Sequence, residues 1–189
     1  MAASIARVPR QPRVTTRTGD DGRTSLFGKL RVPKYDARIA ALGDLDEAES
    51  ALGVARALAK RPVAREIEVL QRELYLLMAE IATSPEQAAP TRADASRVEA
   101  LEARTEGMKA KAVIPPRFIV PGDDAAAAAI DLGRAVVRRG ERTVAKLLDD
   151  GVLDNREILR YLNRLSDALF VLARLQEGRR KTTAKVERR

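Results

Sequence analysis

Apolar side chains recur every three or four residues over five long stretches of the chain, which is the spacing of an amphipathic helix. Proline, glycine or clusters of short polar residues separate the stretches, and such residues end helices. The pattern predicts helices over residues 36–60, 62–83, 94–111, 123–149 and 155–176. Neither an internal repeat nor a second apolar core is visible, so we predict one all-α domain, a bundle of about five helices.

Residues at the ends of the predicted helices support these boundaries. Asp36 is a good N-cap for the first helix, and Asp123 and Asp124 place acidic groups at the start of the fourth. Gly151 is expected to stop the fourth helix. The stretch 114–122 contains three prolines, so it is predicted to form a rigid loop.

The first predicted helix carries two faces. Its apolar stripe consists of Leu42, Leu45, Leu52 and Leu58. A second face holds only small residues and is suited to close contact with another helix, namely Gly43, Ser50 and Gly53. The segments that precede this helix, Leu26–Phe27 and Arg31–Pro33, are predicted to be irregular.

Composition narrows the chemistry that is available. The 189 residues are 45% hydrophobic, enough for one substantial core, and include no cysteine and no histidine. Thiolate chemistry, imidazole bases and the usual zinc sites are therefore excluded. No apolar run approaches the roughly 20 residues of a membrane span, so we expect a cytoplasmic protein without membrane partners.

The charge is strongly positive but unevenly placed. The formal net charge is +8, and residues 1–34 and the tail after Gly178 are the most basic parts. A basic helical module that binds nucleic acid is one alternative, although no basic stretch is interleaved with aromatic residues that could stack on bases. We therefore divide the chain into a basic segment 1–13, a bundle domain 14–176 and a basic tail 177–189.

A glycine- and hydroxyl-rich stretch precedes the first helix, at Thr16–Ser25. Glycines let backbone amides approach an anion closely, and hydroxyls with a nearby cation complete a cradle for polyphosphate. The stretch does not match the Walker A pattern, because no Gly-Lys-Ser/Thr follows the glycines. An ordinary polar turn is the alternative.

A second polar cluster lies on the fourth predicted helix. At 100° per residue Arg134, Arg138, Glu141 and Arg142 share one face, whereas Arg139 lies well round the helix. Guanidinium groups are natural partners of phosphate oxygens. The alternative is a solvated basic face with an Arg138–Glu141 pair.

A third cluster lies on the fifth predicted helix, where Asn163, Asp167, Phe170 and Arg174 share one stripe. Asn and Asp are poor residues for a helix interior, so their side chains are expected to have buried or ligand partners. A hydrogen bond between Asp167 and an arginine of another helix is the simpler interpretation, and both can hold together.

Taken jointly, these clusters resemble the PduO-type ATP:cob(I)alamin adenosyltransferases. The resemblance spans residues 14–176 and includes further motifs: Lys34 after Val32-Pro33, Gly43-x-x-Asp46-Glu47, Phe118-Ile119-Val120-Pro121-Gly122, Arg138-Arg139-Gly140-Glu141-Arg142 and Asn163-Arg164-Leu165-Ser166-Asp167. It implies a homotrimer whose active sites lie at subunit boundaries.

The resemblance also implies which residues bind ATP. One subunit would contribute Thr16, Arg17, Thr18, Gly19, Thr24, Ser25 and Lys34. The next subunit would close the site with Arg138, Arg139, Glu141, Arg142 and Asn163. Mg²⁺ would lie among the triphosphate oxygens. Asp46 and Arg134 would form an ion pair between subunits, and Asp167 would have a structural role.

The implied reaction needs no histidine, since cob(I)alamin attacks C5′ of ATP and expels triphosphate. Lys34, Arg138 and Arg142 are the candidates for stabilising charge on the leaving phosphates. Phe118 would cover the lower axial face of the corrin ring. Gly140 and Thr143 depart from the family pattern, as do Ala168 and the acidic start of the fourth helix. The last two bear on how a corrinoid would pack, so the resemblance implies ATP binding more directly than it implies corrinoid selectivity.

One further alternative is a protein of the same fold that binds ATP or delivers adenosylcobalamin without turnover. Formation of the Co–C bond, followed spectroscopically, separates it from an enzyme. An acceptor enzyme that depends on adenosylcobalamin is a possible partner in either case.

Overall fold

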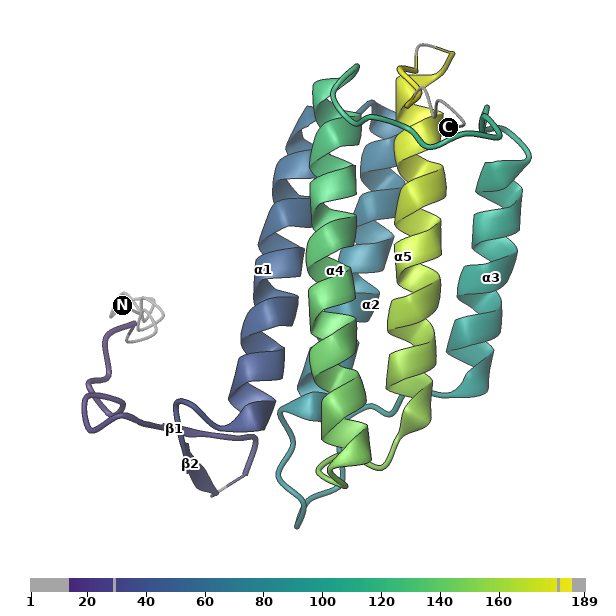
Figure 1. The fold of residues 1–189 in the computed structure, drawn as a ribbon. Helices are drawn as coiled ribbons and strands as arrows, with labels where there is room; N and C mark the ends of the chain where they lie inside the picture. The colour runs from purple at the N-terminus through teal and green to yellow at the C-terminus, as the bar shows by residue number, and fades with distance from the viewer. Residues whose placement is uncertain (1–13, 29, 180, 185–189) are drawn as a thin grey trace, which may run out of the picture.

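The computed structural model describes residues 14–28, 30–179 and 181–184. Five helices form an elongated bundle with a short β-hairpin beside one end of it (Figure 1). The helices are α1 (Ala37–Leu58), α2 (Arg61–Ile81), α3 (Ala95–Lys109), α4 (Ala125–Asp149) and α5 (Arg156–Glu177). The predicted all-α bundle and its five helices are thus confirmed, with boundaries within about two residues of those expected.

The core lies where α4 packs between α1 and α5, with α2 against α1 and α3 against α5. Each helix turns one apolar stripe inward, as the helical period dictates. Fully buried members of this core include Leu45, Leu52, Ile67, Leu74, Ile130, Leu162, Leu165 and Leu169. The apolar stripe expected on α1 is correct at Leu45 and Leu52 but wrong at Leu58, which is 54% exposed.

Glycines on α4, and not on α1, allow the closest helix contact. A Cβ atom at Gly133 would lie 2.9 Å from Leu52 Cδ2, and one at Gly140 would lie 2.6 Å from Leu45 Cδ2. Both distances are too short for carbon atoms, so an alanine at either position would force the facing leucine side chain to move. The small-residue face predicted on α1 does not serve this purpose, because nothing lies within 4 Å of a Cβ placed at Gly43.

Short polar side chains cap four of the helices. Asp36 accepts a hydrogen bond from Arg38 N, which confirms the predicted N-cap, and Asp124, expected only as an acidic group at the start of α4, caps that helix by accepting from Ala127 N. Asp94 and Asn155 do the same for α3 and α5. After α4 the chain turns at Gly151, whose φ is +70°, as expected for a glycine that follows a helix.

Of the two segments expected to be irregular, Arg31–Pro33 forms a strand instead, whereas Leu26–Phe27 lies in the loop of a hairpin. Strands β1 (Arg23–Ser25) and β2 (Arg31–Pro33) pair antiparallel, with Thr24 opposite Val32. With three residues each, the strands are too short to show the alternation by which strands are recognised.

The loop that connects β1 to β2 is fixed to the end of α2. Phe27 N donates to Ala82 O at 2.8 Å, and Ser84 N donates to Phe27 O at 3.0 Å. Gly28 is required here, since its φ is +123° and a Cβ would lie 2.7 Å from Ser84 Oγ. The hairpin and the turn before it therefore project from the bundle on the α1 side (Figure 1).

Within the described ranges, no helix combines the length and the apolar character that crossing a bilayer requires.

Candidate functional site

The glycine-rich stretch forms an exposed turn that leads into the hairpin. Gly22 N donates to Gly19 O at 3.2 Å, and Lys34 N donates to Gly22 O at 2.9 Å. Arg17 and Gly22 both have positive φ angles, +62° and +78°. A Cβ placed at Gly19 would lie 3.2 Å from Lys34 Nζ, so the ammonium group lies directly over the turn. The structure thus brings Lys34 to the turn, as the sequence predicts.

The turn is braced by a residue that the sequence analysis did not identify. Arg31 Nη2 donates to Thr18 O at 2.7 Å and to Asp21 Oδ1 at 2.9 Å. The hydrogen bond from Arg31 is the main reason why the pKa of Asp21 is lower than usual. Since the Arg31 side chain spans from β2 back to the turn, the register of the hairpin, which the sequence did not predict, was needed to find it.

The hydroxyl groups predicted to bind ATP lie on this turn and on β1. Thr16 and Thr18 share a hydrogen bond between their Oγ1 atoms at 3.0 Å and are exposed. Ser25 is also exposed, and Thr24 is half-buried. The turn therefore presents hydroxyls, a bent glycine backbone and one ammonium group to the solvent, which is a set that suits phosphate.

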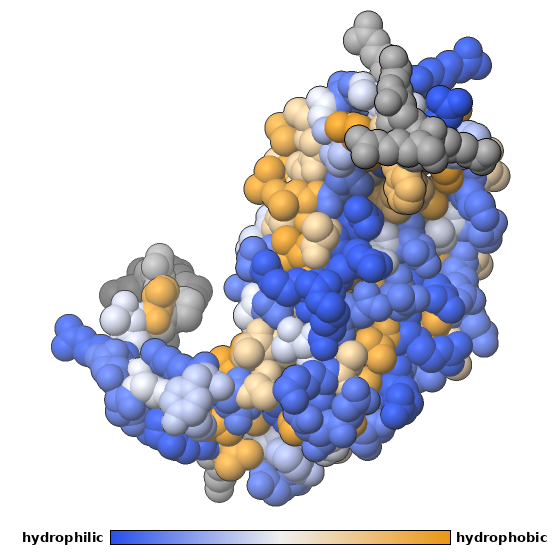
Figure 2. Space-filling view, viewed as in Figure 1, coloured by the Kyte–Doolittle hydropathy of each residue, from blue (hydrophilic) through white to orange (hydrophobic). Residues whose placement is uncertain are grey.

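A groove between α4 and α5 gathers most of the second cluster. Its volume is about 440 Å³, and its lining residues are Arg138, Glu141, Arg142, Ala145, Leu159, Arg160, Asn163 and Arg164. Figure 2 shows hydrophilic side chains in a band across the middle of the face that α4 presents. Four guanidinium groups in one groove make a strongly anion-attracting surface.

The acidic and amide groups of this groove orient each other. Asn163 Nδ2 donates to Glu141 Oε1 at 2.9 Å, and Arg164 Nη1 donates to Asn163 Oδ1 at 2.6 Å. Arg142 Nη1 donates to the carbonyl of Arg138 at 2.9 Å. The alternative Arg138–Glu141 pair does not form, and over the described residues the Arg138 guanidinium has no ion-pair partner.

Arg139 lies apart from this groove, as its helical angle indicates. Its Nε donates to Asp44 Oδ1 at 3.0 Å, and its Nη2 pairs with Glu47, both on α1. Thr143 Oγ1 donates to Asp44 Oδ2 at 2.6 Å and extends the same network. The structure therefore places Arg139 in the contact between α1 and α4, where it does not join the other predicted ATP ligands.

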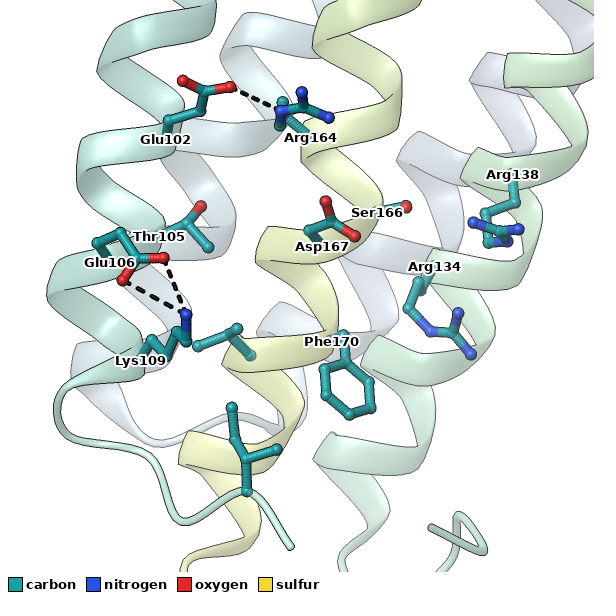
Figure 3. Close-up of a pocket in the computed structure, with 12 residues that line it drawn as sticks. Glu102, Thr105, Glu106, Lys109, Arg134, Arg138, Arg164, Ser166, Asp167 and Phe170 are labelled. Atoms are coloured by element: carbon teal, nitrogen blue, oxygen red, sulfur yellow. Dashed lines mark hydrogen bonds and ion pairs between the residues drawn. The ribbon is translucent and has the colours of Figure 1, made fainter. Parts of the chain in front are cut away.

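A larger cavity of about 630 Å³ lies among α3, α4 and α5 (Figure 3). Residues of the third cluster line it together with residues of α3: Glu102, Thr105, Glu106, Lys109, Ile114, Arg134, Arg138, Arg164, Ser166, Asp167, Phe170 and Val171. Arg138 lines this cavity and the smaller groove, so the two hollows adjoin. The contribution of α3 could not be read from the sequence, since no motif lies there.

Ion pairs line the α3 side of the larger cavity, whereas the Asp167 carboxylate has no partner there among the residues that the structure describes. On one side Glu102 accepts from Arg164 Nε at 2.6 Å, and Glu106 pairs with Lys109 (Figure 3). Asp167 lies in the same cavity, exposed, and within the described part of the chain its carboxylate accepts no hydrogen bond. The hydrogen bond expected between Asp167 and an arginine of another helix is therefore absent among the described residues.

Arg174, the last member of the third cluster, is the centre of a buried ionic network. Its side chain is 1% exposed, and Nη2 lies 2.5 Å from Asp131 Oδ2 while Nε lies 2.9 Å from Glu177 Oε2. The guanidinium also lies 5.2 Å from the centre of the Phe170 ring. Arg134 Nε approaches the other oxygen of Asp131 at 3.5 Å, so the network links the cavity to the end of α5.

Asp46 and Arg134 do not meet within one chain. Asp46 lies in an apolar groove of about 390 Å³ between α1 and α2, lined by Phe27, Ile39, Leu42, Gly43, Asp46, Tyr75, Met78, Ala79 and Ala82. Arg134 lies in the cavity of about 630 Å³ among α3, α4 and α5. The two side chains therefore line separate hollows of the chain.

Phe118 is 78% exposed and lies on the loop between α3 and α4, which hydrogen-bonds to the chain after α5. It does not line either hollow described above. No group of three or more carboxylates that could hold a metal ion occurs within residues 14–28, 30–179 and 181–184.

Comparison with known proteins agrees with this geometry. The family model for cobalamin adenosyltransferases matches residues 14–176. A corrinoid adenosyltransferase of Citrobacter freundii is 37% identical over 87% of this chain and 95% of its own length. The PduO protein of the same organism is 38% identical, and the chain spans about half of its length. A corrinoid adenosyltransferase of Mycobacterium tuberculosis is 38% identical over 86% of this chain and 88% of its own.

Solved structures agree as well. A variant PduO-type ATP:corrinoid adenosyltransferase from Lactobacillus reuteri, complexed with cobalamin and ATP, superposes with a TM-score of 0.81 at 26% identity, covering 92% of this chain and 97% of that one. A second variant of it, complexed with ATP, gives a TM-score of 0.78 at 28% identity, covering 87% and 94%. With the helices, the turn and the arginine groove all in the expected order, we conclude that this chain belongs to the cobalamin adenosyltransferase family.

Proposed function

We propose that this protein transfers the 5′-deoxyadenosyl group of ATP to cob(I)alamin, giving adenosylcobalamin and triphosphate. The electron pair of cobalt(I) forms the bond to C5′, the C5′–O bond breaks, and its electron pair leaves with the triphosphate. The protein then has to hold the two substrates in line and stabilise the charge that develops on the phosphates.

One observation supports this proposal: the chain presents two surfaces whose groups suit phosphate, and each set of groups is incomplete. The turn offers hydroxyls, glycine backbone and Lys34 but faces solvent. The groove on α4 offers Arg138 and Arg142 but has no backbone cradle. A nucleotide held between these two surfaces would contact both sets of groups. Each surface would then supply only part of the nucleotide's binding site.

The two surfaces belong to different copies of the chain in this proposal. The hairpin is tied to α2 by Phe27 and Ser84, so its turn is held away from the groove on α4 of the same chain. A homotrimer with three equivalent contacts would place the turn of one subunit over the groove of the next. Asp46 and Arg134, which face different sides of the chain, would then form the expected ion pair across the boundary and fix its register.

Individual residues of the turn and the groove have distinct roles here. Lys34, Arg138 and Arg142 stabilise the leaving triphosphate, and Mg²⁺ is bound by phosphate oxygens, as suits an ion that keeps several waters. Asn163 and Glu141 hold each other in place beside the arginines. Arg139 pairs with two carboxylates of α1 and holds α4 against that helix. Its contribution to ATP binding would therefore be indirect.

The cavity among α3, α4 and α5 is the place proposed for the corrin ring. It adjoins the arginine groove through Arg138, and Phe170 gives it an apolar surface beside the Asp167 carboxylate. Phe118 would cover the lower face of the ring and exclude an axial ligand and water. A cobalt(II) corrin without that ligand is easier to reduce. The reaction is expected in the cytoplasm, with delivery of the product to an enzyme that depends on it.

An anaerobic assay tests the proposal. The full chain is mixed with ATP, Mg²⁺ and chemically reduced cobalamin, and adenosylcobalamin and triphosphate are measured together. Equal amounts of both products are expected. Release of ADP and phosphate, or binding of both substrates without formation of a Co–C bond, would contradict it, and the second result would favour a delivery protein.

A further inference from the structure

The chain after α5 runs antiparallel to the loop that carries Phe118 and pairs with it at a single β-bridge. We call residues 181–184 the tail strand. Ile119 and Thr183 form an antiparallel bridge, flanked by two hydrogen bonds: Val120 N to Thr182 O at 2.9 Å and Ala184 N to Phe118 O at 2.9 Å. The backbone carbonyl of Phe118 is thus held directly by the tail strand.

A carboxylate adds a third connection. Asp123, which lies just before the N-cap of α4, accepts from Thr182 Oγ1 at 3.0 Å and also from Thr182 N. A carboxylate that accepts from one residue through both its backbone and its side chain fixes the position of that residue. The tail strand is therefore attached to both ends of the segment 118–123.

The loop has few other restraints. Val113, Phe118 and Val120 are exposed. Among the described residues, every hydrogen bond from residues 114–122 to another segment goes to the tail strand. An exposed loop without such bonds is the part of a protein that opens most easily.

The tail strand itself starts from a rigid support. Glu177 belongs to the buried network of Arg174, and the Gln176 side chain bonds both to Asp124 Oδ1, at 3.2 Å, and to Lys60 N, at 3.1 Å. Gly178 N donates to Arg174 O at 3.3 Å. The buried end of α5 therefore anchors the tail strand, and the tail strand in turn holds the loop in place.

We propose that the tail strand, with Asp123, positions the Phe118 loop and thereby holds the phenyl ring where it excludes the lower ligand of the corrinoid. The tail strand lies outside residues 14–176, which the family model matches. The inference rests on the role proposed above for Phe118. Asp123, Thr182 and Ala184 are positioning residues here, because they act through the loop and not on the substrate.

Two proline substitutions in adjacent positions distinguish this positioning role from a general loss of folding. Ala184→Pro removes the N–H that donates to Phe118 O. Thr183→Pro is the matched control, since the N–H of the residue at the centre of this bridge points away from the loop, and an edge strand tolerates proline there. Asp123→Ala is a second variant that leaves the tail backbone unchanged. Thermal unfolding and circular dichroism verify that each variant folds.

Hydrogen exchange of the full chain gives the first measurement, without any ligand. The Val120 amide is expected to exchange about tenfold faster in Ala184→Pro and in Asp123→Ala, the change that loss of one hydrogen bond produces. Thr183→Pro should stay at the wild-type rate. Equal exchange in Ala184→Pro and Thr183→Pro would overturn the proposal, whatever the protein's activity.

The coordination of bound cob(II)alamin gives the second measurement. In the presence of ATP, the paramagnetic resonance spectrum reports the fraction of cobalt that keeps an axial ligand. This fraction should rise in Ala184→Pro and in Asp123→Ala, as in Phe118→Ala, and turnover from cob(II)alamin should fall about tenfold. Turnover from cob(I)alamin should not change in Ala184→Pro and Asp123→Ala. Faster exchange with an unchanged spectrum would refute the positioning role, whereas an unchanged spectrum in Phe118→Ala would refute the role of Phe118 itself.

Discussion

Glycine serves opposite purposes in the helix bundle and in the projecting turn. In α4, Gly133 and Gly140 leave space into which Leu52 and Leu45 pack, and both leucines are fully buried. In the turn, Gly22 has a positive φ and nothing within 4 Å of a Cβ position. The first region has its contacts inside the chain. The second exposes hydroxyl, ammonium and backbone groups to solvent, so loss of a residue should affect stability in the first region and activity in the second.

The largest effect on stability is expected in the buried network. Asp131→Ala leaves Arg174 with one of its two carboxylates and should lower the free energy of unfolding by about 3–5 kcal/mol, because a buried charge loses its partner. Denaturant unfolding measures it. Asp21→Asn, which breaks an exposed pair with Arg31 in the turn, is the control and should leave the midpoint unchanged. Similar losses in both variants would show that the two regions do not differ.

In the groove the effect should be on turnover. Arg138→Ala is expected to lower the rate of adenosyl transfer about 100- to 1,000-fold, the usual result of removing one group that stabilises developing charge. Its unfolding midpoint should not change, since the guanidinium is exposed and has no ion-pair partner in the described chain. A turnover loss below tenfold would remove Arg138 from the proposed machinery.

The same substitution at two helical glycines should have opposite signs. Gly140→Ala is expected to destabilise the protein by about 1–2 kcal/mol, because overpacking against Leu45 exceeds the gain in helix propensity. Gly107→Ala in α3, where nothing lies within 4 Å, should stabilise by up to about 1 kcal/mol. Unfolding curves of the two variants test this, and a gain at both positions would mean that α1 and α4 pack less closely.

The smallest effect is the response of the turn to acid. The pKa of Asp21 is depressed below 3.8 in the folded protein, so its pair with Arg31 stabilises the turn fully above about pH 4 and is lost as the pH falls through the folded pKa. Amide exchange in the turn should accelerate over that range, and not in Asp21→Asn. Acceleration that begins above pH 5 would assign the transition to another group.

The sequence was sufficient to predict where the helices lie but not which residues of different helices contact each other. Period and caps locate all five helices, since both signals are local. The partner of Gly140 could not be predicted, because it depends on which leucine of α1 lies opposite. The same holds for the Asp131–Arg174–Glu177 network and for the tail strand, in which residues distant in sequence meet. Arg139 is the instructive case: its helical angle already set it apart from the face to which the family resemblance assigned it.

Complementation between two inactive variants tests the central claim that the turn of one chain and the groove of another form one site. Lys34→Ala protein, with a damaged turn, is mixed with Arg138→Ala protein, with a damaged groove, unfolded and refolded together, and assayed. About one quarter of the sites should then combine an intact turn with an intact groove, and activity should recover to about that fraction of wild type. Activity no higher than that of the separate variants would contradict a site shared between chains.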